Sequence, residues 1–266
     1  MNYFSATIYG IIQGISEFLP ISSSGHLALL PKFTNWKDPG VAFDLAMHLG
    51  TAFAVIVYFR LEIKNLLYDG FSAIITRENK TKTMRFYNLA ISTIASVICI
   101  LLLKDFALNL GRSKILISIN LSVFGIIMYI ADRSKSLSDQ THNFETLKIK
   151  DSVFMGIFQS LAIFPGVSRS GITLTFGRYK KYTRKESAAF SFLLSLPIIL
   201  AAFIHEIPHL SDSPNFSLGI CLYGVFVSFI IGLITIHYFL KVISKLGLAY
   251  FSLYRVLIAI VIMIFV

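Results

Sequence analysis

Six runs of apolar residues, each long enough to cross a lipid bilayer as a helix, constrain the fold of this chain more than any other feature. A hydrocarbon core of about 30 Å requires about 20 helical residues. The runs lie near 41–59, 87–103, 113–131, 187–205, 217–239 and 249–266. Charged residues make up only 14% of the chain, against about 25% in soluble domains. We therefore expect an all-α polytopic membrane protein with six transmembrane helices in a single domain, 1–266.

Two shorter apolar stretches, near 4–19 and 152–164, end at helix-breaking residues. Pro20 follows the first stretch, and Pro165-Gly166 follows the second. These stretches are typical of half-helices that enter a membrane and turn back, so they predict two re-entrant hairpins. The alternative is a short or tilted ordinary span.

An internal repeat relates these two stretches. GIIQGISEFLPISSSG, residues 10–25, aligns without gaps with GIFQSLAIFPGVSRSG, residues 156–171. The repeat predicts two halves, about 1–131 and 152–266, each with a hairpin followed by three spans. An odd number of crossings between equivalent elements inverts the second copy, so we expect an inverted-topology repeat.

The basic residues give an independent test of this topology, because cytoplasmic loops are enriched in Lys and Arg. Loops around 60–86, 132–151, 176–186 and 240–248 carry 17 of the 24 basic residues, and the loops at the other face carry five. Both termini are therefore predicted on the outer face, and the polar turns of the two hairpins are predicted to meet inside the bilayer. Arg255, near the start of the last run, is expected to snorkel toward the interface.

Several other classes of protein receive little support. The basic excess could indicate nucleic-acid binding, but in so apolar a chain it marks loops, so no nucleic-acid partner is expected. Cys99 and Cys221 lie in apolar runs and form no zinc or disulfide pattern. The first basic residue is Lys32, so the start lacks the basic region of a signal peptide and is expected in the mature protein. Motifs for nucleotide hydrolysis, serine esterases and zinc proteases are absent from the sequence.

Polar residues on the first half-helix are candidates for chemistry. Gln13 and Glu17 are four residues apart and therefore share one helix face. A carboxylate at membrane depth indicates function, although it can also pair with a cation only to hold helices together. Asp44 and His48, also four apart, either line the same pocket or pair helices.

The turn after Pro20 continues as Ser22-Ser23-Ser24-Gly25-His26. Small hydroxyl residues before a renewed apolar run cap a helix, and the free N–H groups of a helix start bind anions such as phosphate. Serine hydroxyls could also attack phosphorus. Simple capping is the alternative, and His26 taken alone is more often a core histidine.

The second turn repeats this device and adds an arginine, Arg169, between Ser168 and Ser170. A guanidinium matches phosphate oxygens and remains charged, which makes it the expected clamp for a diphosphate. A structural ion pair with Glu17 is the alternative, and it is compatible with catalysis. Together these groups predict phosphoryl transfer in a small pocket.

At these residues the sequence resembles the undecaprenyl-diphosphate phosphatase family, also called bacitracin-resistance proteins. Its two signatures match Gln13–Glu17 with the continuation to His26, and the stretch from Pro165 to Thr173. The resemblance implies hydrolysis of undecaprenyl diphosphate to undecaprenyl phosphate and inorganic phosphate, which returns the carrier lipid to peptidoglycan synthesis and confers bacitracin resistance. It also implies a bacterial inner-membrane location.

The resemblance assigns roles residue by residue. It implies Glu17, Ser23, His26 and Arg169 as catalytic residues, with Ser23 as nucleophile and His26 as acid or base. The implied polar lining comprises Gln13, Ser22, Ser24, Ser168, Ser170 and Thr173. Gln13 stands where the family's first motif has a carboxylate, so base and metal-binding roles fall to Glu17. Direct attack by water remains the mechanistic alternative.

The partners expected from the sequence are an isoprenoid diphosphate lipid and the surrounding membrane lipids. A divalent cation, Mg²⁺ or Ca²⁺, held by Glu17 is one option, and no organic cofactor is expected. A homodimer is left open. The rival hypothesis is a lipid-phosphate flippase or transporter that uses the same pocket, because inverted repeats with broken helices are typical of transporters.

Overall fold

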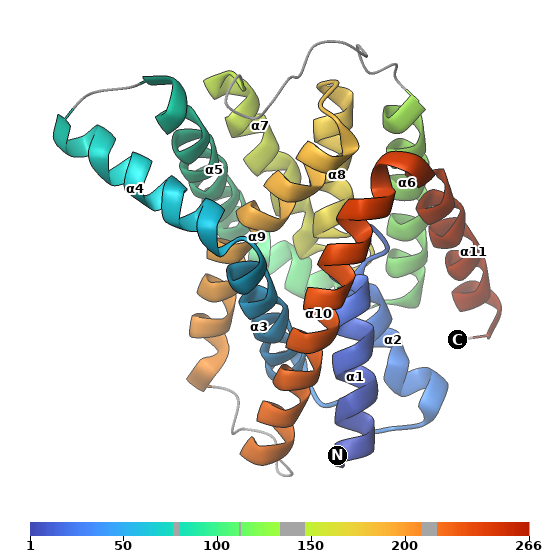
Figure 1. The fold of residues 1–266 in the computed structure, drawn as a ribbon. Helices are drawn as coiled ribbons and strands as arrows, with labels where there is room; N and C mark the ends of the chain where they lie inside the picture. Colours follow the sequence, from blue (N-terminus) through green and yellow to red (C-terminus); the bar gives the residue numbers. More distant parts are fainter. Residues whose placement is uncertain (77–79, 112, 134–146, 209–216, 266) are drawn as a thin grey trace.

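The computed structural model describes residues 1–76, 80–111, 113–133, 147–208 and 217–265 as a bundle of helices (Figure 1). No strand occurs among the described residues, which confirms the all-α prediction. The elements are α1 (Tyr3–Ser16), α2 (Ser23–Thr34), α3 (Val41–Tyr58), α4 (Arg60–Thr76), α5 (Lys80–Leu110), α6 (Lys114–Arg133), α7 (Ile149–Ser160), η2 (Leu161–Ile163), α8 (Arg169–Tyr179), α9 (Arg184–Glu206), α10 (Leu218–Leu246) and α11 (Ala249–Phe265).

Five of the described helices are long and apolar enough to cross a membrane. They are α3, α5 from Thr83, α6, α9 and α10, and each coincides with a run predicted from the sequence. The sixth predicted run forms α11, an apolar helix of 17 residues. The sequence did not predict α4, which occupies a segment expected to be a loop.

Two units, each made of two helices joined by a turn, occupy the positions of the predicted hairpins. α1 and α2 approach from the end of the molecule where the chain begins, and α7 with η2 and α8 approach from the opposite end (Figure 1). Their turns meet, because the Oγ of Ser170 donates to the carbonyl of Leu19 over 3.2 Å.

The same local geometry starts the return helix in both units. Ser22 caps α2 with φ 76° and accepts a hydrogen bond from the N–H of Gly25. Ser168 caps α8 with φ 71° and accepts from the N–H of Gly171. A positive φ is unfavourable for a residue with a Cβ, and such backbone strain is often found at functional sites.

The packing of the two units is reciprocal. α1 packs against α10 of the second half, and α7 packs against α5 of the first half. Both contacts use the equivalent glycines of the repeat. A Cβ on Gly10 would lie 2.8 Å from the carbonyl of Gly224, and a Cβ on Gly156 would collide with the backbone of Ser92. Glycine therefore allows each half-helix to approach its partner closely.

Polar contacts anchor the far end of α8. The carboxylate of Asp132, at the end of α6, accepts from Nε of Arg178 over 2.9 Å and from Nε of Arg184 over 2.8 Å. It also accepts from the N–H of Leu248 over 2.9 Å. Because this carboxylate joins α6, α8, α9 and the start of α11, it fixes the helix that carries Arg169.

Candidate active site

Glu17 lies at the end of α1, where the helix gives way to the turn, and its side chain is 5% exposed. Gln13 Nε2 donates to Oε2 of this carboxylate over 3.0 Å, as expected for two side chains one helical turn apart. Oε1 pairs with the guanidinium of Arg169. A buried carboxylate is tolerated only with such partners.

Ser23 and His48 complete a cluster around Oε2 of Glu17. The hydroxyl of Ser23, the first residue of α2, donates to this oxygen over 2.6 Å. Nε2 of His48, from α3, lies 3.3 Å from the same oxygen and 3.5 Å from the Ser23 hydroxyl. A nucleophile, a carboxylate and an imidazole therefore lie within hydrogen-bonding reach of one another, as in activated-serine sites.

The contact made by Nδ1, the other ring nitrogen, fixes the orientation of the His48 side chain. Nδ1 lies 2.8 Å from the carbonyl of Asp44, one turn earlier in α3. A carbonyl only accepts, so Nδ1 carries a proton and Nε2 is left to exchange one with Glu17 or Ser23.

Arg169 brings the second turn to the first. Its NH2 pairs with Glu17, and its NH1 donates to the carbonyl of Ser191 in α9 over 3.0 Å. Thr173 supports this arrangement, since its hydroxyl donates to the carbonyl of Arg169 and lies 2.6 Å from Oγ of Ser191. The positive group therefore stands between two helix starts that also favour anions.

Arg255 joins the backbones of the two turns. Its side chain is fully buried. NH1 donates to the carbonyl of Pro20 in the first turn over 3.4 Å, and NH2 donates to Gly166 and Val167 in the second, each over 2.9 Å. The expectation that Arg255 snorkels to the interface is wrong, because five backbone carbonyls in the interior hold its guanidinium.

The family model described as bacitracin resistance protein BacA matches residues 6–261. The chain belongs to this family. The undecaprenyl-diphosphatase of Aliivibrio salmonicida (strain LFI1238) is 40% identical over 259 residues, which cover 97% of this chain and 96% of the relative.

Two further relatives carry the same name. The undecaprenyl-diphosphatase of Marinobacter nauticus (strain ATCC 700491 / DSM 11845 / VT8) is 38% identical over 261 residues, 97% of each chain. That of Idiomarina loihiensis (strain ATCC BAA-735 / DSM 15497 / L2-TR) is 36% identical over 266 residues, 98% of each chain. The family membership confirms the resemblance stated from the two motifs, and with the apolar helices it makes the chain a multi-pass membrane protein.

For this member of the BacA family, the structure brings together three of the four predicted catalytic residues: Glu17, Ser23 and Arg169. His26 is placed differently. Its Nδ1 lies 2.7 Å from the carbonyl of Ser22, and its Nε2 lies 2.7 Å from the hydroxyl of Tyr254, on which its ring also stacks. Both nitrogens are thus engaged by groups outside the Glu17 cluster.

Some of the predicted lining residues bond to other parts of the site, and others cap the helices that follow the two turns. Ser170 and Thr173 bond to backbone and to Ser191, and Ser24 lies 3.4 Å from the capping hydroxyl of Ser22. Ser168 caps α8. The simple-capping alternative therefore describes Ser22 and Ser168, whereas Ser23 points to Glu17.

Gln13 offers an oxygen with no protein donor. Its amide nitrogen bonds to Glu17 and lies 3.5 Å from the Thr51 hydroxyl, while Oε1 is buried without a hydrogen-bond partner in the described part of the chain. Mg²⁺ commonly uses one or two carboxylates together with substrate phosphates. Glu17 supplies one such carboxylate, and no group of three or more His, Cys, Asp or Glu side chains that could hold a metal ion occurs among the described residues.

The sequence named Arg255 only as a residue expected to snorkel, did not name Ser191, and left His48 undecided. The only signal for Arg255 was a charge within an apolar run, and nothing in the sequence shows which carbonyls lie near it. His48 carried the spacing signal with Asp44, but the packing of α3 against α1 decides which group it meets.

Proposed function

We propose that this chain is an undecaprenyl-diphosphate phosphatase that releases inorganic phosphate and returns undecaprenyl phosphate for peptidoglycan synthesis. The single observation that carries the proposal is the pairing of Glu17 with Arg169 beside the Ser23 hydroxyl at the junction of two turns. The names of relatives that match nearly the whole chain support the choice of substrate. An isoprenoid diphosphate suits a site among apolar helices.

The proposed architecture has six transmembrane helices, with α11 as the sixth, and two re-entrant hairpins in inverted repeats. The reciprocal packing of α1 and α7 and the matching caps at Ser22 and Ser168 support it. The uneven distribution of basic residues supports cytoplasmic loops at the end where α4 begins and both termini on the outer face. Polar turns at membrane depth are tolerated where they line a cavity.

In this proposal Arg169 changes its partner when the substrate binds. The guanidinium turns from Glu17 to the diphosphate oxygens, and the free N–H groups at the starts of α2 and α8 add further donors. This exchange frees Glu17 to act as a base.

In the first step the Ser23 hydroxyl gives its proton to Oε2 of Glu17, and Oγ attacks the terminal phosphorus. The bond from that phosphorus to the bridging oxygen breaks, and undecaprenyl phosphate departs with the electron pair. In the second step water gives a proton to His48 and attacks the phosphoserine. The Oγ–phosphorus bond breaks, Ser23 regains its proton from Glu17, His48 releases its proton to solvent, and inorganic phosphate leaves.

We assign His26 to support of the first turn and His48 to acid–base chemistry. The contacts of the two rings support this assignment, since His26 bonds to Ser22 and Tyr254 while His48 contacts Glu17. A divalent cation belongs to the proposal as an option, held by Glu17 and Gln13, where it would neutralise phosphate oxygens.

Phosphate release from undecaprenyl diphosphate by detergent-purified protein tests the proposal, with the wild type beside Arg169→Ala. We expect release by the wild type and its loss in the variant, with an unchanged gel-filtration profile. No release by a folded wild type would favour the transport hypothesis instead, because transport gives no signal in detergent. Near-normal release by Arg169→Ala would contradict the assigned site.

A further inference from the structure

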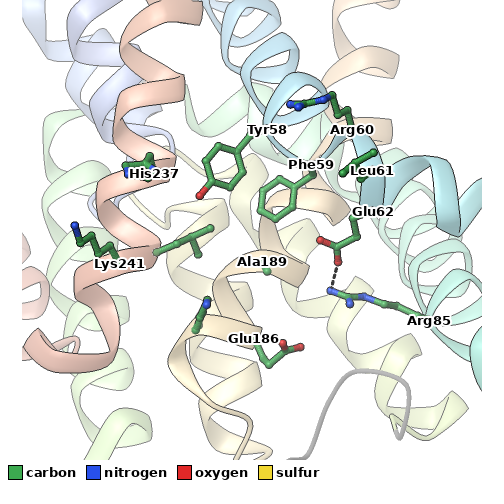
Figure 2. A pocket seen from close by; sticks show the side chains of 12 residues that line it. Tyr58, Phe59, Arg60, Leu61, Glu62, Arg85, Glu186, Ala189, His237 and Lys241 are labelled. Carbon is green, nitrogen blue, oxygen red and sulfur yellow. Dashed lines mark ion pairs between the residues drawn. The ribbon is translucent and has the colours of Figure 1, made fainter.

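A cavity of about 800 Å³ is lined by none of the residues of the Glu17 cluster. Figure 2 shows the side chains that line it. The cavity opens where α3 ends and α4 begins, and it is bounded by the first turns of α9, by one face of α10 and by Arg85 of α5. Its volume lies within the range of about 300–1,000 Å³ that is usual for ligand sites. The proposed reaction assigns no role to it.

The charges around this cavity favour an anion. Lys185 and Lys241 are exposed at its rim, and neither pairs with a carboxylate among the described residues. Arg60 adds a third cation, and its NH1 donates to the carbonyl of Val57. The first turns of α4 and α9 line the cavity, which places the positive ends of two helices there, beside the negative end of α3.

The acidic residues of the cavity are partly neutralised. Glu62 pairs with Arg85 over 2.5 Å (Figure 2). Burial raises the pKa of Glu62, and neighbouring Glu186 raises the pKa further, while Arg85 opposes the shift. The ion pair lowers the negative charge that an incoming anion would meet.

Three buried polar atoms in the cavity wall have no hydrogen-bond partner among the described residues, and one of them, Oε1 of Glu62, still has its ion pair with Arg85. Nε of Arg85 and Oε2 of Glu186 have no hydrogen-bond partner within the described residues. The first requires an acceptor and the second a donor. A phosphate oxygen together with a hydroxyl group would supply both.

The helix α4 places the cavity at the level of lipid headgroups. Unlike α11, which has the same length, it is counted neither among the candidate spans nor among the shorter apolar helices. Among its exposed apolar residues, Leu61, Tyr68, Phe71 and Ile75 recur at intervals of seven, three and four, so they form one stripe, with Leu67 beside it. Such a helix lies in the membrane interface, and α4 projects sideways from the bundle (Figure 1).

We propose that this cavity binds the phosphate of a phosphatidylglycerol headgroup. Lys185 and Lys241 hold the phosphate, and a glycerol hydroxyl donates to Glu186. The apolar side chains Phe59, Ala189 and Leu240 line the same cavity and suit the first methylenes of the lipid. The chemistry shared with free inorganic phosphate is the phosphate group, but the interfacial position of α4 favours the lipid.

Native mass spectrometry of the full-length protein with added phosphatidylglycerol tests this assignment. The test variant is Lys185→Gln/Lys241→Gln, and the matched control is Lys150→Gln/Lys245→Gln, which removes the same charge at exposed positions outside the cavity. We expect lipid binding to weaken about tenfold in the test variant only. Phosphatase activity in detergent serves as a folding control for both variants, so failure here is separate from failure of the proposed reaction.

Two results would overturn the proposal. Equal lipid retention by the wild type and the folded test variant would remove the cavity as the binding site. Displacement of the lipid by millimolar inorganic phosphate, measured in the same spectra, would assign the cavity to the free anion instead. Retention of the lipid under that challenge, with loss in the test variant, supports the headgroup.

Discussion

The Ser23 hydroxyl donates to Oε2 of Glu17 over 2.6 Å, although the two residues lie on different helices separated by a turn. This bond aligns the proposed nucleophile with its base before any substrate is present. Prealignment of this kind lowers the entropic cost of the attack.

Ser23→Ala is therefore expected to lower phosphate release by about 10²-fold or more, because it removes the nucleophile while the carboxylate keeps its other partners. Steady-state kinetics with undecaprenyl diphosphate measure the effect. Ser244→Ala, at an exposed position on α10, is the matched control. A Ser23→Ala enzyme with normal turnover would instead indicate direct attack by water.

Separate substitution of His48 and of His26 by asparagine distinguishes the roles of the two residues. His48 contacts Glu17 over 3.3 Å, whereas His26 bonds to Tyr254. We expect His48→Asn to lower kcat by about 10²-fold and to change the pH profile, as loss of an acid–base group does. His26→Asn is expected to lower thermal stability and to leave the shape of the pH profile intact. The reverse pattern would return the acid–base role to His26.

The spans could be predicted from the sequence because each is a local property of about 20 consecutive residues. α3, α6 and α9 begin and end within a few residues of the predicted runs. The helix α4 could not be predicted in this way, since its apolar residues form a stripe within a charged segment. Its existence depends on an interface that composition alone does not reveal.

The candidate site was predictable where residues close in sequence share a turn or a helix face. Gln13 and Glu17 are an example, and the repeat added Arg169. His48 and Arg255 depend on contacts between helices far apart in the chain. An arginine that bonds to carbonyls leaves no pattern in the residues it contacts, because every residue has a carbonyl.

Gln13→Glu tests whether this site uses a divalent cation. The amide of Gln13 donates to Glu17 over 3.0 Å, so a carboxylate there would repel Glu17 unless a cation bridges them. We expect activity of the variant to rise about tenfold between chelator and millimolar Mg²⁺, more steeply than in the wild type. Phosphate release across a Mg²⁺ titration measures this. The same Mg²⁺ response in both proteins would argue against a cation at these two residues.

Arg255 is predicted to position both turns without touching the substrate. Arg255→Ala would leave the carbonyls of Pro20, Gly166 and Val167 buried without their donor. Each unsatisfied group costs about 1–3 kcal/mol, so we expect a clear fall in melting temperature together with loss of activity. Arg255→Lys keeps the charge but cannot span both turns as a planar guanidinium does, so partial stability with a low kcat is expected.

Gly171→Ala tests whether catalysis depends on where the Arg255 guanidinium lies, because the variant moves this group without removing it. A Cβ at Gly171 would lie 2.7 Å from NH1 of Arg255, so the guanidinium must shift away from Gly171. We expect kcat to fall while the KM for undecaprenyl diphosphate changes little, because the helix starts still bind phosphate but Ser23 and Arg169 are no longer aligned. Thermal melting and steady-state kinetics of the same preparations check this. A variant that melts early but turns over at the wild-type rate would show that Arg255 only stabilises the fold.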